Sequence, residues 1–433
     1  MYAFKFPNGA FTKRAGISTL ASGAASGLDL FSFLLVARIL NAEEMGIFLI
    51  SLMIGAGLVR VGTSNLANVT MRAAARAIDH GKPKDLKFIL DIGVACDTLL
   101  LIFALAAGAC AAYFLVSEKD FLMFAMVLVT VVANTVKPQV LAVAIPRAFG
   151  HHKEIYLLAL LGAALKVALL YAVWSFDGGF SGVVLSFLAW QFVPAIGGLL
   201  LTVRDCLKQG ALSQRRSSFK EFKEDHADFV LLMRAGALTG LPQLAFDLAT
   251  PIVGFFGSVA AAGLFGLAAK LGQAVRIYAE PVAYMLYAEQ CQAVEYGRVR
   301  SLARQTTRWA AGLGGVTAIA ALAFKISDET FIRLLFGTDY IVAIPAVQWC
   351  LIAAIPTAVA MPVQFGLFAL GRTSRVFQAE MFGALTFLVL LTVMAGQPET
   401  AAVALAASRL VSSSASWYYF QRYVNVARQV RNY

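Results

Sequence analysis

Residues Gly27 to Arg60 read GLDLFSFLLVARILNAEEMGIFLISLMIGAGLVR and form two apolar runs joined by the polar segment Asn41-Ala42-Glu43-Glu44. The first run contains the acid Asp29, and the second contains the base Arg60. A charge at membrane depth is costly unless it faces a protein interior or a watery cavity. The stretch therefore predicts two membrane helices joined by a turn, with a polar cavity between lipid-embedded helices.

The composition of the whole chain agrees with a membrane location. Of 433 residues, 59% are hydrophobic and 14% are charged, and the mean hydropathy is +0.73. These values indicate an integral membrane protein. Apolar runs of about 20 residues, each long enough to cross roughly 30 Å of hydrocarbon, recur along the chain. We predict twelve transmembrane helices in an all-α protein, at 17–38, 46–68, 88–114, 121–143, 155–176, 180–203, 229–256, 258–285, 309–326, 341–369, 376–396 and 401–421.

The formal charge of +11 comes from bases in short loops between the apolar runs, so we expect no nucleic acid partner. Most of the loop lysines and arginines fall on one side of the predicted membrane, and only Arg38, Lys119, Lys325 and Arg333 fall on the other. The positive-inside rule then predicts that both termini are cytoplasmic. Basic residues precede the first apolar run, which lacks a convincing cleavage site, so we expect a retained signal anchor.

One polar, basic segment, 204–228, interrupts the series of apolar runs near the middle of the chain. It divides the chain into a six-helix lobe at 1–203, a second six-helix lobe at 229–421 and a basic tail at 422–433. The segment itself is cytoplasmic or interfacial, either as an amphipathic helix on anionic headgroups or as a solvated linker.

The two predicted lobes repeat a pattern of residues. Asp29, Gly46 and Arg60 recur as Asp247, Gly263 and Arg276, at offsets of 218, 217 and 216 residues. A nearly constant offset indicates a duplicated six-helix unit. An even number of helices in each unit gives both copies the same orientation, as parallel repeats. The small-residue runs 23–27 and 260–263 predict close helix packing.

The predicted spans contain more bases than acids in their central parts. The bases are Arg60, Lys137, Lys166, Arg234, Lys270, Arg276 and Arg409, and the acids are Asp29, Asp91, Asp97, Asp247, Glu280 and Glu380. Those near span ends, such as Asp91, Arg234 and Arg409, can reach headgroups or water. Arg276 and Glu280 are four residues apart and share a helix face. The excess of bases predicts an anionic guest, because arginine and lysine bind phosphates well.

The sequence favours transport rather than an enzymatic reaction. The five cysteines are scattered, and the four histidines lie in predicted loops, so we expect no metal site and no histidine proton relay. The chain contains no phosphate-binding loop or hydrolase motif.

Three segments carry a resemblance to a known family. Residues 37–48 (ARILNAEEMGIF), 263–268 (GLFGLA) and 334–340 (LLFGTDY) with 370–373 (LGRT) resemble polysaccharide exporters of the superfamily that also holds multidrug and toxin extruders (MATE) and lipid II flippases. The resemblance implies two pseudo-symmetric, MATE-like lobes around a central cavity, alternating access, and a polyprenyl-diphosphate-linked oligosaccharide as cargo. It also implies that Asp29, Arg60 and Lys270 or Arg276 line the cavity.

The leading hypothesis is therefore a flippase of the bacterial inner membrane that serves exopolysaccharide, capsule or O-antigen assembly. Arg60, Lys137, Lys166, Lys270 and Arg276 would line the cavity and bind the anionic cargo, while Asp29, Asp247 and Glu280 would form ion pairs or couple H⁺ or Na⁺. Its partners would be membrane lipids and a polysaccharide polymerase with its export machinery. The alternatives are a multidrug or cation antiporter of the same fold, a membrane polysaccharide polymerase or ligase, and a non-transporting scaffold.

Overall fold

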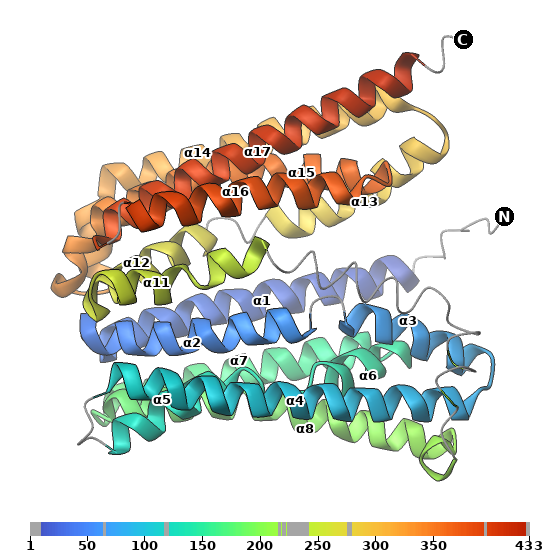
Figure 1. The fold of residues 1–433 in the computed structure, drawn as a ribbon, viewed down its shortest axis with the longest axis horizontal. Coiled ribbons are helices and arrows are strands. Elements are labelled where there is room, and N and C mark those ends of the chain that lie inside the picture. Colours follow the sequence, from blue (N-terminus) through green and yellow to red (C-terminus); the bar gives the residue numbers. More distant parts are fainter. Residues whose placement is uncertain are drawn as a thin grey trace. The chain divides into compact units, whose positions relative to one another are not determined.

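The computed structural model describes residues 10–63, 66–116, 121–214, 242–274, 279–393 and 396–429, together with Ser218 and Phe222, and none of these residues forms a β-strand (Figure 1). The all-α prediction is confirmed. Seven of the described helices are long and apolar enough to cross a membrane, and α5 and α12 are shorter apolar helices. The chain is a multi-pass membrane protein.

The described residues form two compact units. Unit 1 contains the described residues up to 39 and between 54 and 222, and unit 2 contains residues 40–53 and the described residues from 242 to 429. The predicted lobe boundaries at 203 and 229 stay a prediction, because residues 223–241 lie outside the described residues.

Unit 1 is built from the N-terminal helices, and the last part of α2 belongs to it. Its elements are α1 (Ala10–Ile39), α2 (Ala42–Thr63, shared with unit 2), α3 (Leu66–Asp79), α4 (Pro83–Leu115), α5 (Phe121–Ala133), the π-helix η1 (Val140–Ala144), α6 (Ile145–Ala148), α7 (His152–Ser175), α8 (Gly179–Lys208) and the short 3-10 helix η2 (Ala211–Ser213). Within it, α1 packs against α7, and α7 packs against α8.

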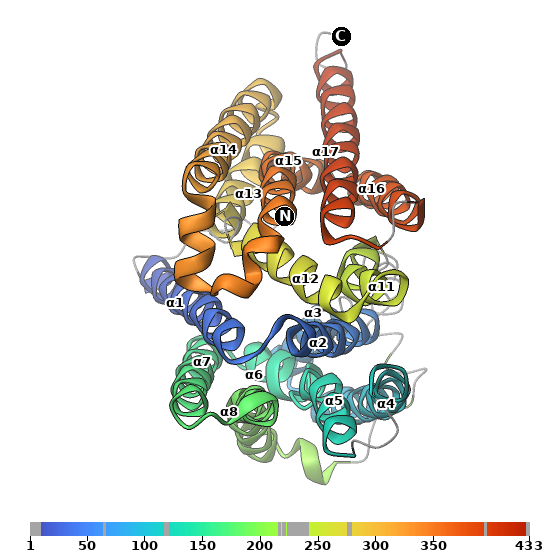
Figure 2. The ribbon, with the colours of Figure 1, turned by 90° about the vertical axis from the view of Figure 1, so that its left-hand side faces the viewer.

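Unit 2 contains the C-terminal helices and the first part of α2. Its elements are α11 (Ala249–Phe256), α12 (Val259–Ala274), α13 (Ala279–Glu295), α14 (Val299–Leu335), the 3-10 helix η3 (Thr338–Ala343), α15 (Ile344–Ala369), α16 (Thr373–Val393) and α17 (Pro398–Gln429). Figure 2 shows α15 inside this unit, between α13 and α14 on one side and α17 on the other.

The turn between the first two helices lies where the sequence predicted it. Helix α1 ends at Ile39, and α2 begins at Ala42. The side-chain oxygen of Asn41 accepts the backbone N–H groups of Glu43 and Glu44 at 3.0 and 2.9 Å, and the Glu44 carboxylate accepts the N–H of Asn41 at 3.2 Å. This reciprocal capping box satisfies N–H groups that the first turn of a helix leaves without partners.

Several helices extend beyond the predicted apolar spans. The amphipathic helix α3 lies mostly where a loop was predicted, and α13 continues ten residues past the predicted span end at 285. The predicted fourth span, 121–143, is divided: α5 ends at Ala133, and a non-helical segment with Pro138 precedes η1. Because proline lacks an N–H and clashes with the preceding turn, it favours this interruption.

Small residues allow close helix packing in unit 2, as predicted for Gly263. A Cβ atom added to Gly263 would lie 2.3 Å from the Ala42 carbonyl oxygen, and one added to Gly46 would lie 1.9 Å from the Val259 carbonyl oxygen. By contrast, a Cβ atom added to Gly27 would meet no described atom within 4 Å. The predicted close packing therefore applies to the run that contains Gly263 and not to Gly27.

Candidate functional site

Unit 2 encloses a cavity of about 80 Å³. Its walls come from the first part of α2, the helical residues just before α11, and from α11, α12, α15 and α17 (Figure 2). Most of the wall is apolar, but several polar side chains reach it: Gln243, Asp247, Thr250, Lys270, Gln273, Thr357 and Arg409. The cavity therefore contains two cations and one acid among its charged lining residues.

Helix α12 presents one face to this cavity. Gly266, Lys270 and Gln273 are spaced by four and three residues, which places them on the same side of a helix. A side chain at Gly266 would meet Leu49 of α2, since an added Cβ would lie 2.5 Å from the Leu49 Cδ1 atom. The glycine lets α2 approach closely, and Lys270 extends beside this contact. Two of the predicted site residues, Asp247 and Lys270, thus line one cavity.

Arg409 is a site residue that the sequence analysis did not select. We expected it to reach headgroups or water, but its side chain is only 11% exposed and lies against the cavity. Its guanidinium carbon lies 3.6 Å from the centre of the Phe246 ring, and its Nη1 lies 3.3 Å from the Glu380 carboxylate. The sequence contained a signal for this pair, because the last two apolar runs contain one acid, Glu380, and one base, Arg409. Buried charges are normally paired, so the two residues could have been predicted to interact.

The Glu380 carboxylate has two further donors. It accepts hydrogen bonds from Ser412 Oγ at 2.8 Å and from Gln364 Nε2 at 2.5 Å. Together with Arg409, these contacts join α15, α16 and α17 behind the cavity wall. The network fixes the position of the Arg409 guanidinium.

Unit 1 contains a second ion pair, between Asp29 of α1 and Lys166 of α7. Lys166 is completely buried, whereas the Asp29 side chain is 50% exposed. The ammonium also lies 3.9 Å from the centre of the Trp190 ring and 4.7 Å from that of Phe187, both on α8. Aromatic faces attract cations most strongly where water is excluded. The Lys166 ammonium therefore pairs with the Asp29 carboxylate and lies against the two aromatic rings of α8. That Lys166 also binds the cargo stays a prediction.

The other predicted site residues are neither among the described lining residues of the cavity nor members of the Asp29–Lys166 ion pair. Arg60 is exposed near the end of α2, and Lys137 is half-buried between α5 and η1. Arg276 lies outside the described residues, as does the side chain of Glu280. Their predicted roles stay predictions.

One acid within the predicted spans has a structural role. The Asp97 carboxylate of α4 accepts the backbone N–H groups of Gln139 and Leu141 at 3.1 and 3.3 Å. These N–H groups belong to the interruption around Pro138 and to the start of η1. A buried backbone N–H without a partner is costly, so Asp97 stabilises the broken segment.

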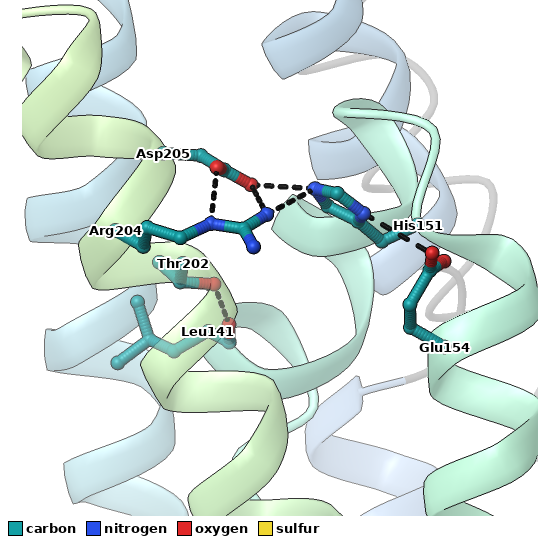
Figure 3. Close-up of polar contacts among 6 residues, drawn as sticks. All are labelled: Leu141, His151, Glu154, Thr202, Arg204 and Asp205. Atoms are coloured by element: carbon teal, nitrogen blue, oxygen red, sulfur yellow. Dashed lines mark hydrogen bonds and ion pairs between the residues drawn. The ribbon is translucent and has the colours of Figure 1, made fainter.

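A third polar cluster joins α7 and α8 in unit 1 (Figure 3). His151 Nε2 lies 2.6 Å from Asp205 Oδ2 and 2.9 Å from Arg204 Nη2, and Arg204 Nε donates to Asp205 Oδ1 at 2.9 Å. The other ring nitrogen of His151, Nδ1, lies 3.6 Å from Glu154 Oε2. The cluster connects the turn before α7 to the last turns of α8. Neither this cluster nor any other group of three or more His, Cys, Asp or Glu side chains in the described part of the chain has an arrangement that could hold a metal ion.

Comparison with solved structures shows which fold these elements form. An inward-facing multidrug resistance MATE family transporter of the MOP superfamily is similar over 96% of this chain and 98% of its own, with a TM-score of 0.70 and 12% sequence identity. A MOP superfamily transporter from Pyrococcus furiosus matches over 97% and 96%, with a TM-score of 0.61 and 13% identity. A mutant of the Vibrio cholerae MATE transporter VcmN matches over 96% of both chains, with a TM-score of 0.61 and 14% identity.

The chain has a MATE-like fold. No protein-family model and no curated protein sequence matches it, so the likeness is one of structure.

Within this MATE-like fold, the cavity of unit 2 is chemically suited to an anionic group. Lys270 supplies a compact ammonium and Arg409 a planar guanidinium, two cations that bind phosphate and carboxylate oxygens. Asp247 is the only acid among the described lining residues, and the Glu380 carboxylate behind the wall offsets the charge of Arg409. The glutamines and threonines at the wall add hydrogen-bonding groups for a polar cargo.

Proposed function

We propose that this chain is a membrane transporter that flips polyprenyl-diphosphate-linked, anionic oligosaccharide units across the bacterial inner membrane. The observation that carries the proposal is the presence of two cations, Lys270 and Arg409, and one acid, Asp247, among the described lining residues of the unit 2 cavity, with Arg409 also paired to Glu380 behind the wall. A diphosphate or an acidic sugar matches such a lining, because charge-assisted hydrogen bonds to anions are among the strongest available.

The membrane potential assists the proposed direction of transport. Each negative charge that moves outward gains about 2.3 kcal/mol per 100 mV. With both termini in the cytoplasm, the cargo would be loaded from the cytoplasmic leaflet and delivered to a polymerase and export machinery outside. Asp247 is the candidate for coupling to H⁺ or Na⁺, because its carboxylate shares the cavity with Lys270.

The proposal is tested with purified protein in liposomes that contain a fluorescent polyprenyl diphosphate-linked sugar. Flipping is measured as the fraction of fluorophore that becomes accessible to a membrane-impermeant quencher. We expect Lys270→Gln to reduce the flipping rate at least tenfold. Lys325→Gln is the matched control, because Lys325 on α14 is exposed and bonds only to Gln348 among the described residues. Equal rates for wild type and Lys270→Gln, or no flipping by the wild-type protein, would overturn the proposal.

A multidrug or cation antiporter is the second candidate, favoured by the similar multidrug MATE structures and by Asp247 in the cavity. The two functions predict opposite signs for one substitution. Removing the ammonium with Lys270→Gln weakens the binding of an anionic cargo and lowers the repulsion of a cationic one. Faster ethidium transport by this variant, driven by a proton gradient, would support the antiporter.

A further inference from the structure

The outward face of α14 begins with three arginines at regular spacing. Arg300, Arg304 and Arg308 follow one another at intervals of four residues, so they form a stripe about 12 Å long that turns by about 40° per step. All three are exposed, and together with Ala303 and Thr307 they line an open groove of about 450 Å³. None of the three forms a hydrogen bond or ion pair with a residue in the described part of the chain.

This stripe is electrostatically unfavourable for the helix that carries it. Like charges four residues apart on a helix repel each other and destabilise it. No acid lies within four positions of any of the three arginines on α14, since the acids of this helix, Asp328 and Glu329, are near its other end. The neighbouring base Arg298 lies over the ring of Tyr296, with 5.4 Å between its guanidinium carbon and the ring centre. An external anion at the groove would remove the repulsion.

The same helix face becomes apolar after the arginines. Counting 100° per residue, Gly315, Leu322 and Ile326 lie within about 40° of the direction of Arg304. Leu322 is 62% exposed and Ile326 is 80% exposed, as expected for side chains that contact lipid tails. The arginine stripe therefore continues into a surface of the kind that faces the hydrocarbon.

Two glycines lie between the arginines and the large apolar side chains. Gly312 and Gly315 are exposed, and a Cβ atom added to either would meet no described atom within 4 Å. Close packing within the described chain thus does not require them, although glycine is unfavourable in the middle of a helix. At these two positions the exposed surface of α14 has no side chain, which leaves a depression between the arginines and the large apolar residues. Gly312 and Gly315 lie about 6 and 11 Å from Arg308 along the helix axis, within half the thickness of the hydrocarbon.

The geometry points to a binding site for an anionic phospholipid on the outer face of α14, with the headgroup phosphate between Arg304 and Arg308 and an acyl chain across Gly312 and Gly315. Arginine matches the phosphate because its planar fork donates two parallel hydrogen bonds. The continuity of the cationic groove with an apolar depression favours a lipid over a soluble anion, which would use the groove alone. The site is independent of the cargo cavity, since the two share no lining residue.

The site is tested with the purified full-length protein in detergent, titrated with dioleoyl phosphatidylglycerol and with dioleoyl phosphatidylcholine. Native mass spectrometry counts the bound lipids. We expect saturable binding of phosphatidylglycerol, and at least tenfold weaker binding to the Arg304→Gln/Arg308→Gln variant, because each basic residue contributes to the attraction of anionic lipid. The control variant is Lys325→Gln/Arg333→Gln, which removes two exposed charges from the other end of the same helix and should bind like the wild type.

A second variant tests the acyl-chain contact separately. Gly312→Leu/Gly315→Leu fills the depression without changing any charge and, because the space is open, is compatible with the fold. We expect this variant to bind phosphatidylglycerol severalfold more weakly than the wild type does. Neither protein should bind soluble glycerol phosphate. Unchanged lipid binding by the arginine variant would overturn the site, as would binding of glycerol phosphate at the same concentration. If the wild-type protein forms a dimer, and the glycine variant abolishes the dimer but binds as many lipids as the wild type, then this face binds a second copy of the chain instead of a lipid.

Discussion

Gly46 and Gly263, related by the 217-residue repeat of the sequence, face each other where α2 and α12 come together in unit 2. A Cβ atom added to Gly263 would lie 2.9 Å from the Gly46 nitrogen and 3.2 Å from its Cα. Two residues at corresponding positions of the predicted repeat thus approach each other closely within unit 2.

The first prediction concerns this contact. Gly263→Ala forces backbone atoms of α2 to move, because the new Cβ would lie 2.3 Å from the Ala42 carbonyl oxygen. We expect a loss of about 1–3 kcal/mol in stability, the usual cost of overpacking. The thermal unfolding midpoint of the purified protein in detergent measures it. Gly27→Ala is the matched control, because an added Cβ there meets no described atom within 4 Å, and an equal effect of both substitutions would contradict the prediction.

The second prediction separates the two partners of the unit 1 ion pair. Asp29→Asn leaves the fully buried Lys166 ammonium without its carboxylate, whereas Lys166→Met leaves an Asp29 carboxylate that is 50% exposed. An uncompensated buried charge costs about 3–5 kcal/mol. We therefore expect Asp29→Asn to lower the unfolding midpoint clearly more than Lys166→Met does.

The double variant completes this cycle. Asp29→Asn/Lys166→Met should be more stable than Asp29→Asn alone, because the second substitution removes the buried charge. Additive losses in the double variant would mean that the two side chains do not interact. Thermal unfolding of all four proteins in one detergent decides between these outcomes.

The sequence predicts those features of the structure that depend on residues close together in the chain. The turn between the first two helices was predicted from the polar segment Asn41–Glu44, and the structure places it at residues 40 and 41, with Glu43 and Glu44 in the first turn of α2. The helix α3 was missed because Arg72 and Arg76 make it polar, and the prediction relied on continuous apolar runs. A helix that is apolar on one side only is not distinguished from a loop by mean hydropathy.

The site residues were predictable to different degrees for the same reason. Asp29, Lys166, Asp247 and Lys270 could be selected because charges within apolar runs are unusual. That Lys166 is buried against Asp29 depends on the packing of α1 against α7, which residue spacing does not give. Arg409 was expected to reach headgroups or water because it was counted among the charges near span ends. Its pairing with Glu380, 29 residues away on another helix, depends on helix packing that residue spacing does not give.

The third prediction concerns the cluster between α7 and α8. His151→Ala removes the ring nitrogen that lies 2.6 Å from Asp205 Oδ2, on a carboxylate whose side chain is only 9% exposed. We expect a loss of about 1 kcal/mol in stability, typical for one hydrogen bond. His80→Ala is the control, because His80 is exposed at the end of α3. A lower unfolding midpoint for the His151 variant alone is the expected result, and equal midpoints for the two variants would contradict it.

The fourth prediction separates the structural and functional roles of Arg409. Glu380→Gln replaces a carboxylate that accepts three hydrogen bonds with an amide that has only one oxygen, and it removes the carboxylate charge that lies 3.3 Å from Arg409 Nη1. Because Arg409 is 11% exposed, we expect a loss of about 3 kcal/mol. The double variant Glu380→Gln/Arg409→Gln should regain most of this stability, since no buried charge remains. If Arg409 also binds the anionic cargo, the stable double variant still flips the labelled polyprenyl diphosphate-linked sugar at least tenfold more slowly than the wild type. Normal flipping by the double variant would restrict Arg409 to holding α16 and α17 together and leave Lys270 as the cargo-binding cation of the cavity.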